Sequence, residues 1–252
     1  MRKSVLSHLR LVPESEPTAI AVDVHGRGDT PVVFIPGLGD SSVESFGLVM
    51  DDLNSIAMVV GYARPGIGAS APADDVTARG VRSAAAELRQ VLARAAVVSP
   101  HVLVGHSYGA LIALAYADAW PEDTAGVVLV DASDPQLFLD SGQAVVDDGD
   151  QAGSVPFDVA MTLEEVRSIV APLPMPVTVV SSRPGRWLDL PPALARQWQP
   201  RTLPELDAHW QQHQDALAER LDADQLVAAV GGHYVQQDQP ELVTSVIRGL
   251  LA

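Results

Sequence analysis

One pentapeptide in this sequence has residue types and spacing that could support nucleophilic chemistry. It is Gly105-His106-Ser107-Tyr108-Gly109, a G-x-S-x-G pattern that follows an apolar run and precedes a run that favours helix. In that context the serine sits on a sharp turn between a strand and a helix, and the glycines leave room for the turn. The first amide groups of the helix then point toward any negative charge that develops near the serine oxygen. The pattern therefore predicts Ser107 as a nucleophile.

A serine nucleophile needs a base to accept its proton, and His233 is the best placed of the 7 histidines. It lies between the last expected strand and the closing helix, so a loop at the end of that strand can carry its imidazole to the serine. The pair His209 and His213 has a spacing that suits a metal ion, but no glutamate lies between the two residues. A polar helix face is the simpler interpretation of that pair.

Two aspartates could orient the imidazole, and the acid is expected to lie between the serine and the histidine in the chain. Asp131 stands at the carboxyl end of the expected strand 126–131. Asp189 comes after the next expected strand, 176–181, and the turn that directly follows that strand contains no carboxylate. The expected geometry favours Asp131 and leaves Asp189 as the alternative acid.

Two backbone amides should bind the oxyanion that forms when the serine attacks a carbonyl group. One is the amide of Tyr108, which directly follows the serine. The other is the amide of Leu38, in the Pro36-Gly-Leu-Gly39 turn that follows an apolar strand candidate at 31–36. Glycines on both sides of Leu38 permit a tight backbone turn there.

Apolar, strand-like runs alternate with helix-like segments along most of the chain. The expected strands are 31–36, 56–61, 101–105, 126–131, 176–181 and 225–230, and the expected helices are 76–97, 108–119 and 241–251. Strands that are apolar throughout and separated by helices are typical of a parallel sheet covered on both faces. Two further strand candidates, 6–12 and 19–24, have no helix between them and suit an antiparallel edge.

Residues 134–173 interrupt this alternation, with one expected helix at 163–170. The segment is too long for a simple connection between two strands, so we expect a small cap over the pocket. The α/β core then comprises residues 1–133 and 174–252. An irregular surface excursion is the alternative interpretation of the segment.

Composition limits the possible functions of the chain. Its 252 residues are 47% hydrophobic and carry a net charge of −16, without any cysteine. Disulfides, thiolate metal sites and cysteine nucleophiles are thereby excluded. The acidic balance argues against nucleic acid and anionic membranes as partners. Because no apolar run is long enough to span a bilayer, a cytoplasmic protein is expected.

Four stretches together resemble the α/β-hydrolase superfamily: Pro36-Gly-Leu-Gly39, Arg64-Pro-Gly-Ile-Gly-Ala-Ser70, the Ser107 pentapeptide, and the segment from Gly232 to Pro240. The resemblance implies an α/β-hydrolase fold: a mostly parallel central sheet with helices on both faces and a small cap insertion. In that family the acid commonly follows the strand that corresponds to 176–181, and in some members it follows the preceding strand. The resemblance therefore also leans toward Asp131.

The expected activity is that of a serine hydrolase, similar to carboxylesterases, lipases or lactonases, which cleaves an ester-type bond through an acyl-enzyme. Its partner would be a small-molecule substrate, and neither a metal nor an organic cofactor is needed. A serine nucleophile argues against the aspartate-based dehalogenases and epoxide hydrolases of the superfamily. A cofactor-free acyltransferase, a perhydrolase, a C–C hydrolase and a non-catalytic ligand sensor are the alternatives.

The substrate pocket is expected to be lined by Leu38, Tyr108 and apolar cap residues. The cap residues are Phe138, Leu139, Phe157 and Met161. An apolar lining favours an uncharged, partly hydrophobic acyl group. The alternative is that these side chains form the core of the cap itself.

Overall fold

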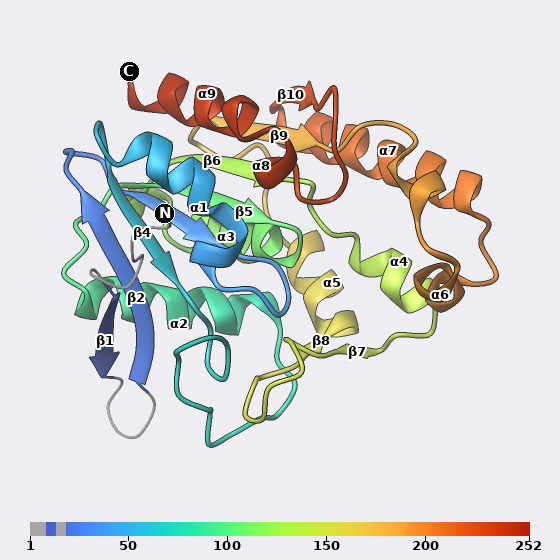
Figure 1. Cartoon of the computed structure of the whole chain (residues 1–252), viewed down its shortest axis with the longest axis horizontal. Helices are drawn as coiled ribbons and strands as arrows, with labels where there is room; N and C mark the ends of the chain where they lie inside the picture. The colour runs from blue at the N-terminus through green and yellow to red at the C-terminus, as the bar shows by residue number, and fades with distance from the viewer. Residues whose placement is uncertain (1–8, 14–18) are drawn as a thin grey trace, which may run out of the picture.

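The computed structural model describes residues 9–13 and 19–252, and its centre is an eight-stranded sheet (Figure 1). The strand order is β1-β2-β4-β3-β5-β6-β9-β10. The strands of this sheet are β1 (Leu9–Pro13), β2 (Ala19–Gly26), β3 (Val32–Ile35), β4 (Met58–Tyr62), β5 (His101–His106), β6 (Thr124–Val130), β9 (Val177–Ser181) and β10 (Asp224–Val227). Pairing is antiparallel at β1–β2 and β2–β4 and parallel from β4 to β10. The predicted fold class, a mostly parallel sheet with an antiparallel edge, is confirmed.

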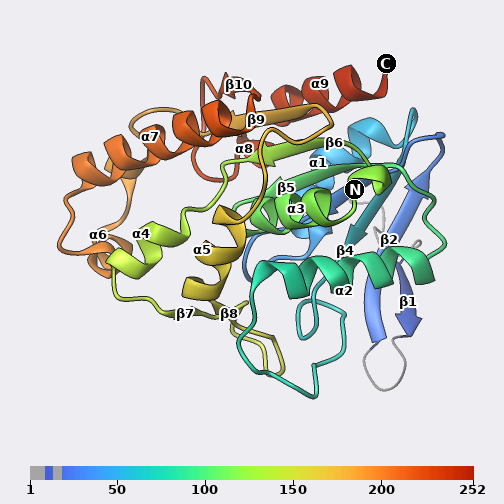
Figure 2. The ribbon, with the colours of Figure 1, turned by 180° about the vertical axis from the view of Figure 1, so that it is seen from behind.

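Helices cover both faces of this sheet. Helices α1 (Ser42–Leu53), α8 (Val235–Asp238) and α9 (Pro240–Leu251) lie in front of it in Figure 1. Helices α2 (Val81–Arg94), α3 (Tyr108–Ala119) and α7 (Leu203–Leu221) lie on the other face, which Figure 2 shows. Successive side chains of a strand point to opposite faces, so β3, β4, β5, β6 and β9 each contribute to two apolar cores. This is the physical reason for the uninterrupted apolar runs in the sequence.

Helix α2 is shorter than the expected helix 76–97 because contacts from elsewhere in the chain set its start. The Glu165 carboxylate accepts the backbone amide of Arg82 at 2.9 Å. A Cβ atom at Gly80 would lie 2.3 Å from the same carboxylate, so the glycine permits this close approach. At the other end, Ala96 has a positive φ of 55° and lies outside the helix.

Other expected elements also differ in their bounds, and one lies partly outside the described residues. The helix expected at 163–170 is α5 (Val159–Arg167), which begins where Asp158 accepts the amide of Met161 at 2.8 Å. The last strand, β10, ends before the expected residue 230, and its four residues are exposed at the sheet edge. Of the strand expected at 6–12, residues 6–8 lie outside the described residues.

The segment 134–173 connects β6 to β9. It contains α4 (Pro135–Asp140), the two short paired strands β7 (Val145–Val146) and β8 (Phe157–Asp158), and α5. A second excursion, 182–202, connects β9 to α7 and packs on α4 through an aromatic cluster. The buried members of this cluster are Leu137, Trp187, Trp198, Leu206 and Trp210. The assignment of 134–173 as a separate cap remains a prediction.

None of the helices in the described part of the chain combines the length and the hydropathy needed to cross a membrane.

Candidate active site

Ser107 occupies a strained turn between β5 and α3. Its backbone has φ 54° and ψ −120°, a conformation that residues other than glycine rarely adopt. A Cβ atom at Gly105 would lie 2.4 Å from the carbonyl oxygen of Gly109, and one at Gly109 would lie 2.2 Å from that of Ile35. Both glycines are therefore required by close backbone contacts, as the pentapeptide pattern predicts.

The structure brings Ser107, His233 and Asp131 together in one line of hydrogen bonds. The Nε2 atom of His233 lies 2.9 Å from Ser107 Oγ. Its Nδ1 atom lies 2.7 Å from Asp131 Oδ2. The imidazole thus bridges a hydroxyl and a carboxylate that come from the ends of two neighbouring strands, β5 and β6.

Asp131 is fully buried, and its carboxylate has several partners besides His233. Its Oδ1 atom accepts hydrogen bonds from the amide of Ser182 at 2.9 Å and from Nε1 of Trp210 at 2.8 Å. Burial alone would raise the pKa of Asp131, but the charge of Arg186 and the hydrogen bond from His233 outweigh it and hold the pKa below its usual range. The carboxylate is therefore held in its ionised form.

Asp189, the alternative acid, lies in different surroundings. Its carboxylate is 69% exposed and pairs with Arg183 on the same loop. Among the described residues, its hydrogen-bond partner is that arginine and not His233. The structure therefore brings Asp131, and not Asp189, to the imidazole.

One face of α7 holds the segment that follows β6. Trp210 reaches Asp131, and Gln214 donates to the carbonyl oxygen of Ala132 at 2.8 Å. His209 Nε2 lies 2.7 Å from Asp134 Oδ2. His209, one of the two histidines that the sequence analysis interpreted as a polar helix face, therefore contacts the segment that follows β6. Within the described residues, no group of three or more histidine, aspartate or glutamate side chains could hold a metal ion.

His106 supports the loop that carries His233, a role that the sequence did not indicate. The two imidazole rings lie 4.6 Å apart between their centroids, and Nε2 of His106 donates to the carbonyl oxygen of His233 at 2.9 Å. The pKa of His106 is lowered to about 3, mainly by burial and secondly by the nearby His233. His106 is therefore a neutral donor at physiological pH.

Ser133 is a second hydroxyl at the site that sequence reasoning missed. Its Oγ atom lies 3.0 Å from Ser107 Oγ, and the residue is buried. Its amide also donates to the carbonyl oxygen of Ser107 at 3.2 Å. The signal available in the sequence was its position just after Asp131, at the same strand end.

A buried ion pair fixes the turn that contains Leu38. Arg64 donates from Nη1 to the carbonyl oxygen of Pro36 at 2.7 Å and from Nη2 to Asp148 Oδ1 at 2.7 Å. It also donates to the carbonyl oxygen of Gly37. Asp148, from the segment 134–173, accepts the amide of Gly39 at 3.0 Å. Residues on both sides of Leu38 are therefore held in place, and we call this group the Arg64–Asp148 clamp.

The two amides expected to bind an oxyanion are not used elsewhere in the described structure. Neither the amide of Leu38 nor that of Tyr108 donates a hydrogen bond to any described residue. Tyr108 is the first residue of α3, and its side chain is buried, with the hydroxyl donating to Thr162 Oγ1 at 3.0 Å. Its hydroxyl is therefore used within the fold, whereas its backbone amide, at a helix N-terminus, remains available.

The four apolar residues expected to line the pocket have different surroundings. Phe157 is fully buried, with its ring centroid 4.7 Å from that of Tyr108. Phe138 and Leu139 are half-buried, and Met161 is exposed. Their contribution to a substrate pocket remains a prediction.

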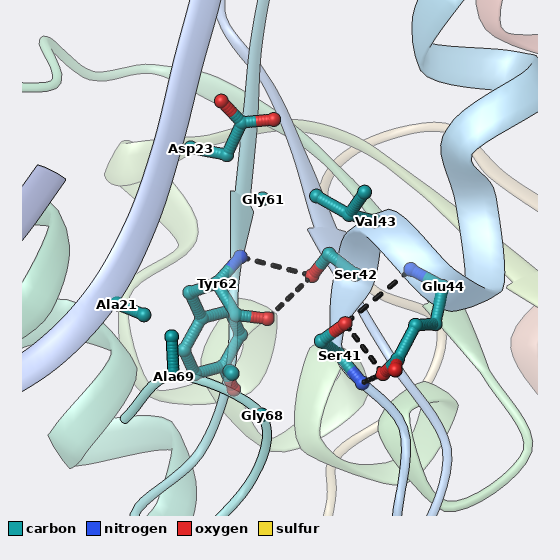
Figure 3. A pocket seen from close by; sticks show the side chains of 11 residues that line it. Ala21, Asp23, Ser41, Ser42, Val43, Glu44, Gly61, Tyr62, Gly68 and Ala69 are labelled. Atoms are coloured by element: carbon teal, nitrogen blue, oxygen red, sulfur yellow. Dashed lines mark hydrogen bonds between the residues drawn. The ribbon is translucent and has the colours of Figure 1, made fainter. Parts of the chain in front are cut away.

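Figure 3 shows a cavity that lies between β2, β4 and the first turn of α1. Its volume is about 230 Å³. Ser42 Oγ on its wall accepts the amide of Tyr62 at 2.9 Å and donates to a strand carbonyl oxygen, while Ser41 and Glu44 cap α1. These polar groups are used within the fold, and neither Ser107 nor His233 is among the residues that line the cavity.

Comparisons with known proteins agree with this architecture. The family model described as the alpha/beta hydrolase fold matches residues 30–166, more than half of the chain. An uncharacterized protein of Bacillus subtilis, YqjL, is 35% identical over 109 residues, which are 42% of this chain and 41% of that protein. The chain thus matches about two fifths of the length of this relative.

Solved structures are similar over nearly the whole chain. A putative lipase from Acinetobacter baumannii superposes with a TM-score of 0.69 and 15% identity, covering 97% of this chain and 91% of that one. A thermophilic esterase from Thermogutta terrifontis gives a TM-score of 0.64 and 16% identity, covering 97% and 98%. At such low identity, these similarities are evidence for the fold alone.

Proposed function

Because the chain belongs to the α/β hydrolase fold family, we propose that it is a serine hydrolase that cleaves ester-type bonds in small molecules. The observation that carries the proposal is the line of hydrogen bonds from Ser107 through His233 to Asp131, at 2.9 and 2.7 Å. A hydroxyl, a base and a buried carboxylate in this order form the arrangement that activates a serine for attack on a carbonyl group.

In the first half of the proposed reaction, Ser107 Oγ bonds to the carbonyl carbon of the ester. His233 Nε2 takes the hydroxyl proton, and Asp131 stabilises the resulting imidazolium. The bond between that carbon and the alcohol oxygen then breaks, and His233 returns the proton to the leaving alcohol. The product of this half is an acyl-enzyme on Ser107.

In the second half, water attacks the acyl-enzyme while His233 accepts one of its protons. The bond between the acyl carbon and Ser107 Oγ breaks, and the proton passes from His233 to the serine. A carboxylic acid leaves and the resting state is restored. None of these steps requires a metal or an organic cofactor.

The amides of Leu38 and Tyr108 are the proposed donors to the oxyanion of both tetrahedral intermediates. Their availability supports this role, since neither donates to another described residue. The Arg64–Asp148 clamp supports it as well, because preorganised donors need not rearrange as charge develops. Loss of one such donor raises the barrier by about 3 kcal/mol in enzymes of this kind.

The proposed substrates are esters with an uncharged, partly hydrophobic acyl group. Half-buried Phe138, whose ring centroid lies 6.4 Å from that of Tyr108, supports an apolar acyl site, as does half-buried Leu139, which packs against the same apolar core. The esterase and lipase among the structural relatives are consistent with this class.

The proposal is tested by hydrolysis of p-nitrophenyl esters of increasing chain length. The unmodified protein should turn over at least part of the series, and Ser107→Ala should lose about 10⁶-fold in kcat. Ser83→Ala, which changes an exposed serine on α2, is the matched control and should retain full activity. Equal turnover by the unmodified protein and Ser107→Ala, or no turnover of any ester, would overturn the proposal.

A further inference from the structure

Arg186 is a buried cation next to the proposed triad, in the short 3-10 helix Arg186–Asp189 after β9. Its guanidinium carbon lies 4.3 Å from the ring centroid of Trp187 and 4.3 Å from that of Trp210. The side chain is only 9% exposed. Stacking between two indole rings fixes the guanidinium in place and favours a cation there.

The guanidinium faces the same carboxylate oxygen that holds the imidazole. Arg186 Nε lies 3.4 Å from Asp131 Oδ2, which is also the oxygen that contacts His233 Nδ1 at 2.7 Å. Nε makes no hydrogen bond with any described residue. The arginine therefore acts on Asp131 through its charge, without competing for the hydrogen bond of the imidazole.

Other titratable groups face this pair from the surrounding elements. Asp207 of α7 accepts the amides of Gly185 and Trp187 and interacts with the charge of Arg186. His106 of β5 is buried and His213 of α7 is largely buried, and burial lowers the pKa of each, so both are neutral near pH 7. Asp40, at the end of the Leu38 turn, faces His233, and burial raises its pKa.

We propose that Arg186 is a positioning residue that balances the charge of Asp131, so that the Asp131–His233 pair resists proton uptake in mildly acidic solution. A buried carboxylate favours a cation beside it. Without Arg186, the imidazole would be the nearest group able to supply that cation, by taking up a proton. A protonated imidazole cannot act as the base, so the arginine extends the acidic limit of activity.

The electrostatics of Asp131 support this role. Burial acts to raise the pKa of Asp131, and the charge of Arg186 is the largest of the effects that lower it. Two sites that share one carboxylate titrate as a unit, so the relevant quantity is proton uptake by the pair. The inference rests on the proposed function only for its kinetic readout.

The kinetic test is the pH profile of kcat/KM for ester hydrolysis by Arg186→Met and Arg186→Lys. The midpoint of the acidic limb should move upward by about one pH unit in Arg186→Met, a size typical of a nearby charge. It should stay near its original pH in Arg186→Lys, which keeps the charge. Arg183→Gln, which removes a half-exposed arginine paired with Asp189, is the matched control and should leave the midpoint unchanged.

A second measurement needs no turnover. Proton uptake by the imidazole of His233 is followed by NMR in Ser107→Ala, with and without Arg186→Met. Arg186→Gln, whose amide can still stack between the indoles, replaces Arg186→Met if that variant does not fold. The same upward shift is expected in the absence of catalysis.

Two results would overturn the inference: a uniform loss of activity with no shift in either measurement, or an equal shift in Arg186→Lys. If no ester is hydrolysed but the NMR midpoint still moves, the proposed function fails and the role of Arg186 stands.

Discussion

At the scale of single residues, the two aspartates that the sequence offers as the acid, Asp131 as the preferred one and Asp189 as the alternative, have opposite surroundings in the structure. Asp131 is fully buried and accepts hydrogen bonds from an amide, an indole and an imidazole. Asp189 is largely exposed and pairs with a neighbouring arginine. An exposed ion pair of that kind contributes little to stability. Removing the charge of a buried carboxylate that is fully hydrogen-bonded alters the side chain that the carboxylate orients.

Asp131→Asn should therefore lower kcat for ester hydrolysis by about 10⁴-fold, because the amide no longer favours the imidazole tautomer that accepts the serine proton. Asp189→Asn should remain within about twofold of the unmodified protein, since it removes only an exposed surface pair. Steady-state kinetics of the two variants side by side make the comparison. A large loss in Asp189→Asn alone would assign the acid to Asp189 instead.

The three side chains that the structure brings together, Ser107, His233 and Asp131, could be proposed from the sequence because each follows from local order: a strand, then a turn, then a chemical group. Sequence reasoning missed Ser133, His106 and Arg186 as neighbours of those groups. Their contacts depend on how strand ends and loops meet in space, and the flanking residues do not specify this. The guanidinium of Arg186 in particular stacks between two indole rings, and one of these comes from α7.

At the scale of elements, the difference between local signals and contacts with distant residues explains which helix bounds could be predicted. Helix α3 matches its expected range because a glycine-flanked turn begins it and a proline follows it. Helix α2 departs from its expected range because a residue of another helix caps it: Glu165 of α5 accepts an amide in the first turn of α2. Capping by a residue distant in the sequence leaves no local signal.

The Arg64–Asp148 clamp joins two elements, the Leu38 turn and the segment 134–173. Asp148→Asn keeps the shape of the side chain but leaves Arg64 buried without its counter-ion. We expect kcat to fall by about tenfold to 100-fold with little change in KM, because a loosened oxyanion turn affects the transition state more than substrate binding. The rates are normalised to active sites titrated with a serine-reactive phosphonate.

The matched control for the clamp is Asp150→Asn, which changes an exposed aspartate in the same stretch of the chain. It should behave like the unmodified protein. Equal kinetics for both variants would mean that the ion pair does not position the turn.

At the scale of the whole molecule, buried histidines link stability to pH. Burial lowers the pKa of His101, His106 and His213, and that of His106 reaches about 3. Below pH 6.5 the unfolded chain binds protons at these sites that the folded chain does not, so stability falls as the pH falls. Asp131 adds to the loss below its unfolded pKa, because its lowered folded pKa stabilises the fold only while the carboxylate is ionised.

The free energy of unfolding should therefore decrease between pH 6.5 and pH 4, by about 1.4 kcal/mol per pH unit for each histidine that is neutral only in the folded state. Urea denaturation at a series of pH values measures the slope. His106→Asn, which keeps a side-chain donor for the carbonyl oxygen of His233, should flatten it by about one proton. An unchanged slope in that variant would show that His106 does not contribute.

Asp148 has a practical consequence for remodelling this protein. Exchanging the segment 134–173 for that of a relative is an obvious route to a new substrate range. Such a graft would also remove the counter-ion of Arg64 and so disturb a turn that the exchange was never meant to touch. A chimera that retains an aspartate aligned with Asp148 should keep its rate on simple esters, while one without it should bind substrate and turn it over slowly.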